Sequence, residues 1–215
     1  MKKLLSLALA ASLITAPAVM AEQISFNNSW KEQKFSLFSK NKYSFGGGTL
    51  GIQSDASVSM TYLRLPENAW SSTKAAWRWR VDQSVPATDL RKKGDDDRNF
   101  SFYMIFMSKD EALQFKGKSL RRLFKAKTAR ILVYTWGGAH GRGKVFDSPY
   151  SSGVGKTVIL RDAGTGNHRE SVDFVSDYKR AFGGTPGAVV GFAITADSDD
   201  TDTAIRAQMS NLVLN

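Results

Sequence analysis

The segment from residue 75 to residue 107 constrains the fold most, because it has the pattern of two strands joined by an acidic loop. In residues 75–81 apolar and basic or small side chains alternate, which is typical of a strand with one buried and one solvated face. The apolar face carries Ala75, Trp77, Trp79 and Val81, and the other face carries Ala76, Arg78 and Arg80. Residues 100–107 are apolar on both faces, as expected for a central strand covered on both sides.

Further short strand patterns follow along the rest of the chain. A capping box at Ser108 predicts one short helix, and Asp173 predicts a second by its position before an apolar i, i+4 pattern. Many short strands with two minor helices predict a mainly all-β fold, a β-sandwich similar to jelly rolls, concanavalin or carbohydrate-binding modules. The predicted strands lie at residues 49–54, 57–65, 130–136, 156–161, 188–196 and 204–214.

The first 21 residues have the pattern of a secretory signal peptide. Lys2 and Lys3 precede an apolar run over residues 4–14 that is too short to span a membrane, and we expect cleavage after Ala21 or after Ala18. Residues 22–215 then form one domain of a size that can bury a full core. We expect a periplasmic or secreted protein, and no later stretch is apolar for long enough to span a membrane.

The chain has no cysteine, which excludes a disulfide framework, a thiol nucleophile, a thiolate metal site and a lipidated N-terminal cysteine. Its formal net charge of +10 falls to +8 once Lys2 and Lys3 are removed. Such a charge attracts anionic envelope components, although it also serves solubility alone. Residues 116–130 hold seven basic residues with apolar ones between them, so this segment either docks on a membrane or partner or forms a solvated edge. We expect no nucleic acid partner.

Two acidic loops follow predicted strands, at residues 94–98 and 197–202. Adjacent carboxylates repel one another unless a cation lies among them, and Ca²⁺ prefers such oxygen ligands, while Arg98 offers an alternative counter-charge. The second loop is not an EF-hand, because Asp202 stands where glycine is needed and Gln208 where a bidentate glutamate is needed. A Ca²⁺ site of another type is one alternative, with candidate ligands Asp95, Asp96, Asp197 and Asp199.

We predict that the two acidic loops converge on one polar rim with aromatic side chains beside it. Trp136 lies at a predicted strand end before two glycines and is the candidate platform, with Tyr150 in a following turn. The predicted ligand-binding residues are Asp95, Asp96, Arg98, Trp136, Tyr150, Asp197 and Asp199.

Several of these segments together resemble the bacterial domain-of-unknown-function family 3047, in order and spacing, over roughly residues 30–213. The resemblance implies a secreted β-sandwich similar to lectin-like and carbohydrate-binding modules, and it implies no activity. The chain departs from the family at Asp200 and Asp202, where the family usually has asparagine and glycine. The matching segments are residues 77–81, Gly94-Asp95-Asp96 with Arg98, and residues 134–136, 148–150, 177–183 and 194–201.

These observations favour a non-catalytic binding protein for a carbohydrate or another envelope polyanion. One alternative is a polysaccharide hydrolase that uses Asp96 with Asp197 or Asp199 as its paired carboxyl groups. Another is a structural or interaction protein that docks through residues 116–130. The sequence gives no oligomeric state.

Overall fold

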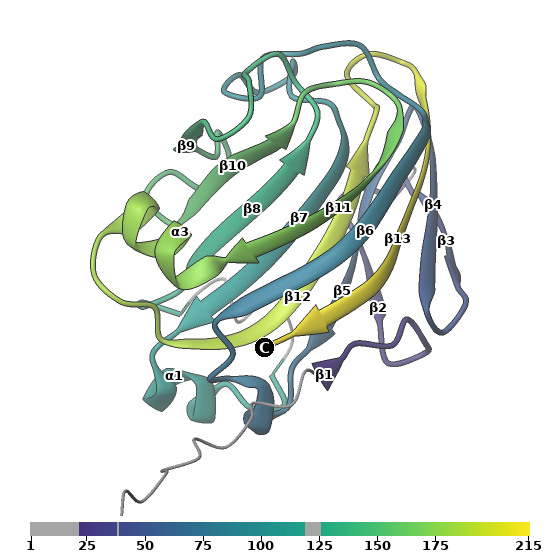
Figure 1. Ribbon diagram of the computed structural model, residues 1–215. Helices are drawn as coiled ribbons and strands as arrows, with labels where there is room; N and C mark the ends of the chain where they lie inside the picture. The colour runs from purple at the N-terminus through teal and green to yellow at the C-terminus, as the bar shows by residue number, and fades with distance from the viewer. Residues whose placement is uncertain (1–21, 38, 119–125) are drawn as a thin grey trace, which may run out of the picture.

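The computed structural model describes residues 22–37, 39–118 and 126–215, which form two β-sheets stacked face to face (Figure 1). The six-stranded sheet has the order β11-β6-β13-β4-β3, and β1 pairs with the end of β13. All of its pairings are antiparallel. Its strands are β1 (Glu22–Gln23), β3 (Lys42–Phe45), β4 (Thr49–Asp55), β6 (Lys74–Gln83), β11 (Gly166–Asp173) and β13 (Ala204–Leu214).

The second sheet has seven strands in the order β2-β5-β12-β7-β8-β10-β9. Its pairings are antiparallel except between β8 and β10, which run parallel. Its strands are β2 (Lys31–Lys34), β5 (Val58–Arg64), β7 (Arg98–Met107), β8 (Arg130–Trp136), β9 (Val145–Asp147), β10 (Gly155–Arg161) and β12 (Ala188–Asp197).

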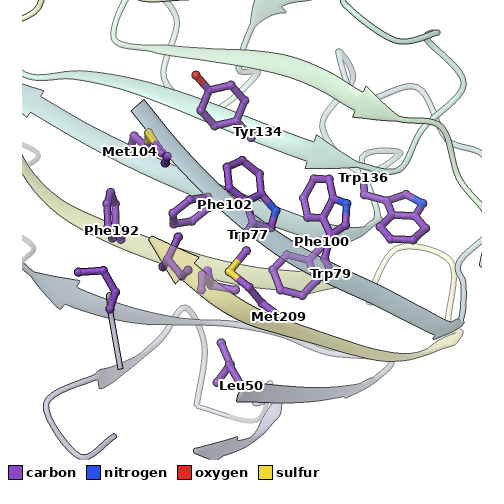
Figure 2. Packing of buried hydrophobic residues seen from close by; sticks show 14 of the residues in the cluster. Leu50, Trp77, Trp79, Phe100, Phe102, Met104, Tyr134, Trp136, Phe192 and Met209 are labelled. Carbon is purple, nitrogen blue, oxygen red and sulfur yellow. The ribbon is translucent and has the colours of Figure 1, made fainter. Parts of the chain in front are cut away.

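One aromatic core fills the space between the sheets (Figure 2). Trp77 and Trp79 of β6 point inward, and the ring of Trp77 meets that of Phe102 of β7 edge-on with centroids 5.0 Å apart. The predicted burial of Trp77 and Trp79 is confirmed. The alternation in β6 leaves Arg78 and Arg80 exposed on the outer face of the sheet. Burying several large aromatic side chains supplies much of the hydrophobic stabilisation of a two-layer fold.

A second apolar cluster lies on the outer face of the seven-stranded sheet, so β7 and β12 are covered on both sides. Helix α1 (Lys109–Gln114) packs against β12, and the Ser108 side chain accepts a hydrogen bond from the Glu111 amide as the capping pattern predicts. Helix α3 (Phe174–Phe182) follows β11 and is capped by Asp173, as predicted. A short 3₁₀ helix, η1 (Glu67–Ala69), follows β5.

The predicted β-sandwich with two short α-helices is confirmed, and each predicted strand is present within a few residues. The short strand β9 and the edge strand β11 were not predicted. Residues 1–21 and much of the basic segment 116–130 lie outside the described residues. Within the described part of the chain, no helix has the length and apolar character needed to cross a membrane.

Candidate ligand-binding cleft

A cleft of about 620 Å³ opens on the outer face of the seven-stranded sheet, at the end where β12 finishes and β7 begins. Pockets of this volume suit small ligands or short polymer segments. Five of its apolar lining residues come from outward-facing positions of β5, β7 and β8, opposite in parity to the core residues of the same strands. The side chains involved are Val58, Met60, Tyr103, Ile131 and Val133.

Strand register brings the two acidic loops together. Asp197, the last residue of β12, pairs directly with Arg98, the first residue of β7, so the loop after β12 and the loop before β7 lie side by side. Asp97 then ties them: its carboxylate accepts hydrogen bonds from the Thr201 amide (2.7 Å) and from the Asp200 amide (3.3 Å). The predicted convergence of the two loops is therefore present in the structure.

Arg98 is the centre of the polar network in the cleft, and its side chain is only 13% exposed. Its Nη1 donates to Asp96 Oδ2 at 2.7 Å and lies 3.2 Å from Asp197 Oδ2. Its Nε donates to the hydroxyl of Ser101 at 2.8 Å, and its Nη2 to the hydroxyl of Tyr103 at 3.3 Å. A guanidinium that uses three nitrogens in this way is fixed in one orientation, and it holds both carboxylates in place.

The glycine after β8 makes room for Arg98. A Cβ atom on Gly137 would lie 2.6 Å from the Arg98 Cβ and 2.8 Å from its Cα, which is too close for any other residue type without movement of the backbone. The φ angle of Gly137, 154°, also favours glycine. The glycine at this position therefore serves the close packing of β8 against the start of β7.

Tyr150 covers the cleft from the loop between β9 and β10. Its hydroxyl donates to Asp96 Oδ1 at 2.6 Å, while 60% of the residue stays exposed. Burial of the hydroxyl, with the hydrogen bond to Asp96, raises its pKa far above the usual value. Lys93 Nζ lies 5.4 Å from the centre of the ring. The ring is thus an exposed aromatic surface held in place by a buried carboxylate.

Asp197 differs from Asp96 in its surroundings. Its Oδ1 has no hydrogen-bond partner among the described residues, although the atom is buried. Burial is the main cause that raises the pKa of Asp197 to about 8, and the nearby Asp199 carboxyl adds to it. Arg98 opposes the shift, but its shorter contact is with Asp96. The cleft therefore holds one carboxyl group, that of Asp96, with two strong donors, and a second, that of Asp197, whose pKa is raised by burial.

One group of carboxylates has the proximity that a cation site requires. Oxygen atoms of Asp97, Asp199 and Asp200 all lie within 4.8 Å of one another. All three are oxygen donors of the kind that Ca²⁺ accepts. However, Asp97 already accepts hydrogen bonds from the neighbouring loop with both of its oxygens, which explains its burial without a cation. The predicted Ca²⁺ site, with its different ligand set, stays a prediction.

Comparison with known proteins places the chain in a family. A family model described as "Protein of unknown function (DUF3047)" matches residues 28–213. The chain belongs to this family. No curated protein matches its sequence.

Solved structures with a similar overall arrangement share little sequence with this DUF3047 member. The xyloglucanase domain of NopAA from Sinorhizobium fredii, in complex with cellobiose, is 8% identical with a TM-score of 0.46, over 92% of this chain and 98% of that one. The family 11 xylanase from Neocallimastix patriciarum is 10% identical with a TM-score of 0.44, over 91% and 100%. A family 29 carbohydrate-binding module from Piromyces equi is 10% identical with a TM-score of 0.30, over 91% and 89%.

The structure brings most of the predicted site residues of this DUF3047 member together, with two exceptions. Asp96, Arg98, Tyr150, Asp197 and Asp199 all line the cleft. Asp95 does not line it and is exposed on the outer side of its loop, because its neighbours Asp96 and Asp97 are the two carboxylates that turn inward.

The prediction that Trp136 is a ligand platform is wrong. Its side chain lies in the core between the sheets, with its ring 5.5 Å from that of Trp79 and 5.0 Å from that of His168 (Figure 2). Alternation along β8 decides this, because Trp136 has the same parity as the core residues Leu132 and Tyr134. Its place at the strand end was misleading, since β7 and β6 extend alongside it.

Sequence reasoning missed Tyr103 and the apolar lining of the cleft. Tyr103 faces away from the core because it alternates with Phe102 and Met104, and this parity was readable from the sequence. Phe35, which is 58% exposed, also lines the cleft but comes from a segment without clear alternation. No sequence signal indicated that it lies near the acidic loops.

Proposed function

We propose that this protein is an exported binding protein, periplasmic or secreted, that holds an uncharged carbohydrate segment in the cleft. The observation that carries the proposal is the exposed ring of Tyr150, fixed through its hydroxyl to Asp96 beside the Arg98 network. Aromatic rings pack against the C–H faces of sugars, and fixed carboxylates accept hydrogen bonds from sugar hydroxyls. A ring that is already ordered loses little conformational entropy on binding.

The charge of the cleft favours a neutral glycan over a polyanion. Asp96, Asp197, Asp199 and Asp200 line it, whereas Arg98 is the one cationic side chain among its described lining residues. Arg98 is also already occupied by two carboxylates. An anionic polymer would have to approach uncompensated carboxylates, which like-charge repulsion disfavours.

Glycoside hydrolysis is the second candidate, and one geometric observation favours it. Asp96 and Asp197 both contact Nη1 of Arg98, at 2.7 and 3.2 Å, so their nearest oxygens are no further apart than the sum of these distances. Retaining glycosidases hold their two carboxyl groups about 5–5.5 Å apart, one ionised and one protonated. In this cleft Asp197 would be the general acid and Asp96 the nucleophile. Asp96 is only 2% exposed and makes two strong hydrogen bonds, which weighs against its attack on a sugar.

Calorimetric titration of the full chain with neutral oligosaccharides, selected on a glycan array, tests the proposal. Tyr150→Ala should weaken binding at least about tenfold. The loss of one ordered aromatic contact with the sugar should cost about 1.4 kcal/mol of binding free energy or more. Leu113→Ala is the matched control, because Leu113 is exposed on α1 outside the cleft. Failure of every neutral glycan to bind, or equal losses in both variants, would contradict the proposal.

The same glycans separate binding from hydrolysis. If the native chain releases reducing ends and Asp197→Asn abolishes the release while retaining affinity, the protein is a hydrolase. If bound glycan is recovered intact, it is a binding protein.

A further inference from the structure

The outer face of the six-stranded sheet carries a band of cations that the cleft does not involve. This basic band runs diagonally from β11 to β3 and has one exposed cation on β11, two on β6, one on β13 and one on β3. It lies on the opposite side of the sandwich from the cleft, because the cleft is on the outer face of the other sheet. Its residues are Arg169, Arg78, Arg80, Arg206 and Lys42.

Two arginines of the band face each other without a counter-charge. Arg169 and Arg78 are direct partners in the antiparallel pairing of β11 with β6. Neither side chain makes a hydrogen bond or ion pair with any other part of the chain that the structure describes. Directly opposed like charges destabilise a sheet. Folding therefore gives no reason for this pair, whereas an anionic ligand would.

Acidic residues near the band neutralise little of it. At the end of β6, Nη2 of Arg80 lies 2.9 Å from Oδ2 of Asp82 in an ion pair. Arg206 and Lys42 line a polar hollow of about 380 Å³ together with Lys40 and a single carboxylate, Asp55. The band thus ends in a recess that is itself basic.

Between the cations stand uncharged hydrogen-bonding side chains. Arg80 has Asn167 on one side and Gln208 on the other in the strand register, and Gln53 lies between Arg206 and Lys42. Amide side chains donate to and accept from hydroxyl groups, and guanidinium groups bind carboxylates through two parallel hydrogen bonds. This alternation matches a polymer that carries both hydroxyls and carboxylates.

The same face lacks features that other polyanions would need. The large exposed apolar side chains among the described residues are Phe35, Leu37, Leu113 and Tyr150, and none belongs to this sheet. Insertion into a lipid surface requires apolar anchors, and single-stranded nucleic acid is held by aromatic stacking. The five strands from β11 to β3 span about 19 Å at the usual strand spacing, which is long enough for several sugar units.

We propose that the basic band binds a carboxylate-bearing polysaccharide, as a second site independent of the cleft. The polymer crosses the sheet diagonally, with its carboxylates on the arginines and its hydroxyls on the amide side chains. The ligand of the band is therefore an anion, whereas the ligand proposed for the cleft is uncharged.

Binding of polygalacturonate by the full chain at low ionic strength tests this inference. The double variant Arg78→Gln, Arg169→Gln should bind at least about tenfold more weakly, because each arginine loses its charge-assisted hydrogen bonds to a ligand carboxylate. Its melting temperature should not fall, since the variant removes a repulsion. A binding loss with unchanged folding separates a ligand role from a structural one.

The matched control is the double variant Lys144→Gln, Lys179→Gln, which removes the same charge from exposed positions outside the band. It should change the affinity by less than about twofold, because it alters only the long-range electrostatic field. Tyr150→Ala should leave polygalacturonate binding intact. Equal losses in both double variants would overturn the proposal and indicate attraction by net charge alone. Absence of polygalacturonate binding, or stronger binding to polyphosphate or anionic lipid vesicles, would overturn it as well.

Discussion

Replacing Asp197 by asparagine should change the pH dependence of stability more than any other single substitution in the cleft. Its pKa rises from 3.8 to about 8 on folding, mainly through burial. Between these two values the folded chain keeps a proton that the unfolded chain has lost. The unfolding free energy therefore falls as the pH rises from about 4 to about 8. A shift of one pKa unit corresponds to about 1.4 kcal/mol. This carboxyl alone therefore lowers the unfolding free energy by roughly 5 kcal/mol between pH 4 and pH 8.

The side chain introduced by Asp197→Asn would resemble the protonated acid at every pH. The amide has the same shape as the neutral carboxyl, and its oxygen can accept from Arg98 in the same way. We expect the variant to match the native chain near pH 4 and to be more stable by several kcal/mol at pH 8. Asp95→Asn, which removes an exposed carboxylate from the facing loop, should leave the pH profile unchanged.

Urea denaturation at steps from pH 4 to pH 9, followed by tryptophan fluorescence, measures the required free energies because four tryptophans are buried or nearly so in the core. Parallel profiles for the native chain and Asp197→Asn would show that Asp197 is ionised throughout. In that case the contrast between Asp96 and Asp197, on which the hydrolase alternative depends, would be absent.

Two further substitutions test the framework of the cleft. Arg98→Met should lower the unfolding free energy by about 3–5 kcal/mol, because it leaves the buried Asp96 carboxylate with Tyr150 as its main donor. Urea denaturation measures this change. A loss below about 1 kcal/mol would contradict the central role of Arg98. Trp136→Phe should lower the melting temperature through imperfect filling of the core and should leave glycan affinity unchanged; a folded Trp136→Phe protein without affinity would show that this tryptophan contacts the ligand after all.

Side-chain alternation was sufficient to predict the sandwich and much of its core. In β6 the alternation of Trp77 and Trp79 with Arg78 and Arg80 assigned each residue to its face correctly. Capping residues located both short helices, because the hydrogen bond that a capping side chain accepts from a backbone amide of the first turn depends on local sequence alone. The edge strand β11 escaped prediction because its outward positions are polar and its inward ones include His168 and Glu170.

The Trp136 error shows where local patterns mislead. Proximity to a strand end suggested exposure, whereas the parity of the residue in β8 indicated burial, and parity proved decisive. Burial at a strand end depends on whether the neighbouring strands extend as far. Here Phe100 of β7 is the direct partner of Trp136, and Trp79 of β6 covers it from the other sheet. Neither neighbour can be identified from the sequence of β8.

The site itself depended on a register that the sequence does not encode locally. Asp197 and Arg98 are almost a hundred positions apart in the chain, yet they pair directly because β12 and β7 lie antiparallel at the centre of their sheet. The pairing is irregular at this point, because Thr195 pairs with Ser101 whereas Asp197 pairs with Arg98, and this bulge lets Arg98 reach Ser101 and Tyr103 on the cleft side. The apolar residues of β7 and β12 on both faces fix the register, and the polar cluster is a consequence of it.

The two proposed ligands follow from a separation of charge between the two outer faces. The cleft on the seven-stranded sheet holds carboxylates in excess of cations, while the basic band on the six-stranded sheet holds cations in excess of carboxylates. Opposed Arg78 and Arg169 would relax if either were neutral, so their presence argues for a ligand on that face. Added salt should weaken attachment at the band and leave the cleft nearly unaffected, because only the band depends on exposed, unpaired charges. Such a division would let the protein attach to an acidic matrix through one sheet while the other remains open to a neutral glycan.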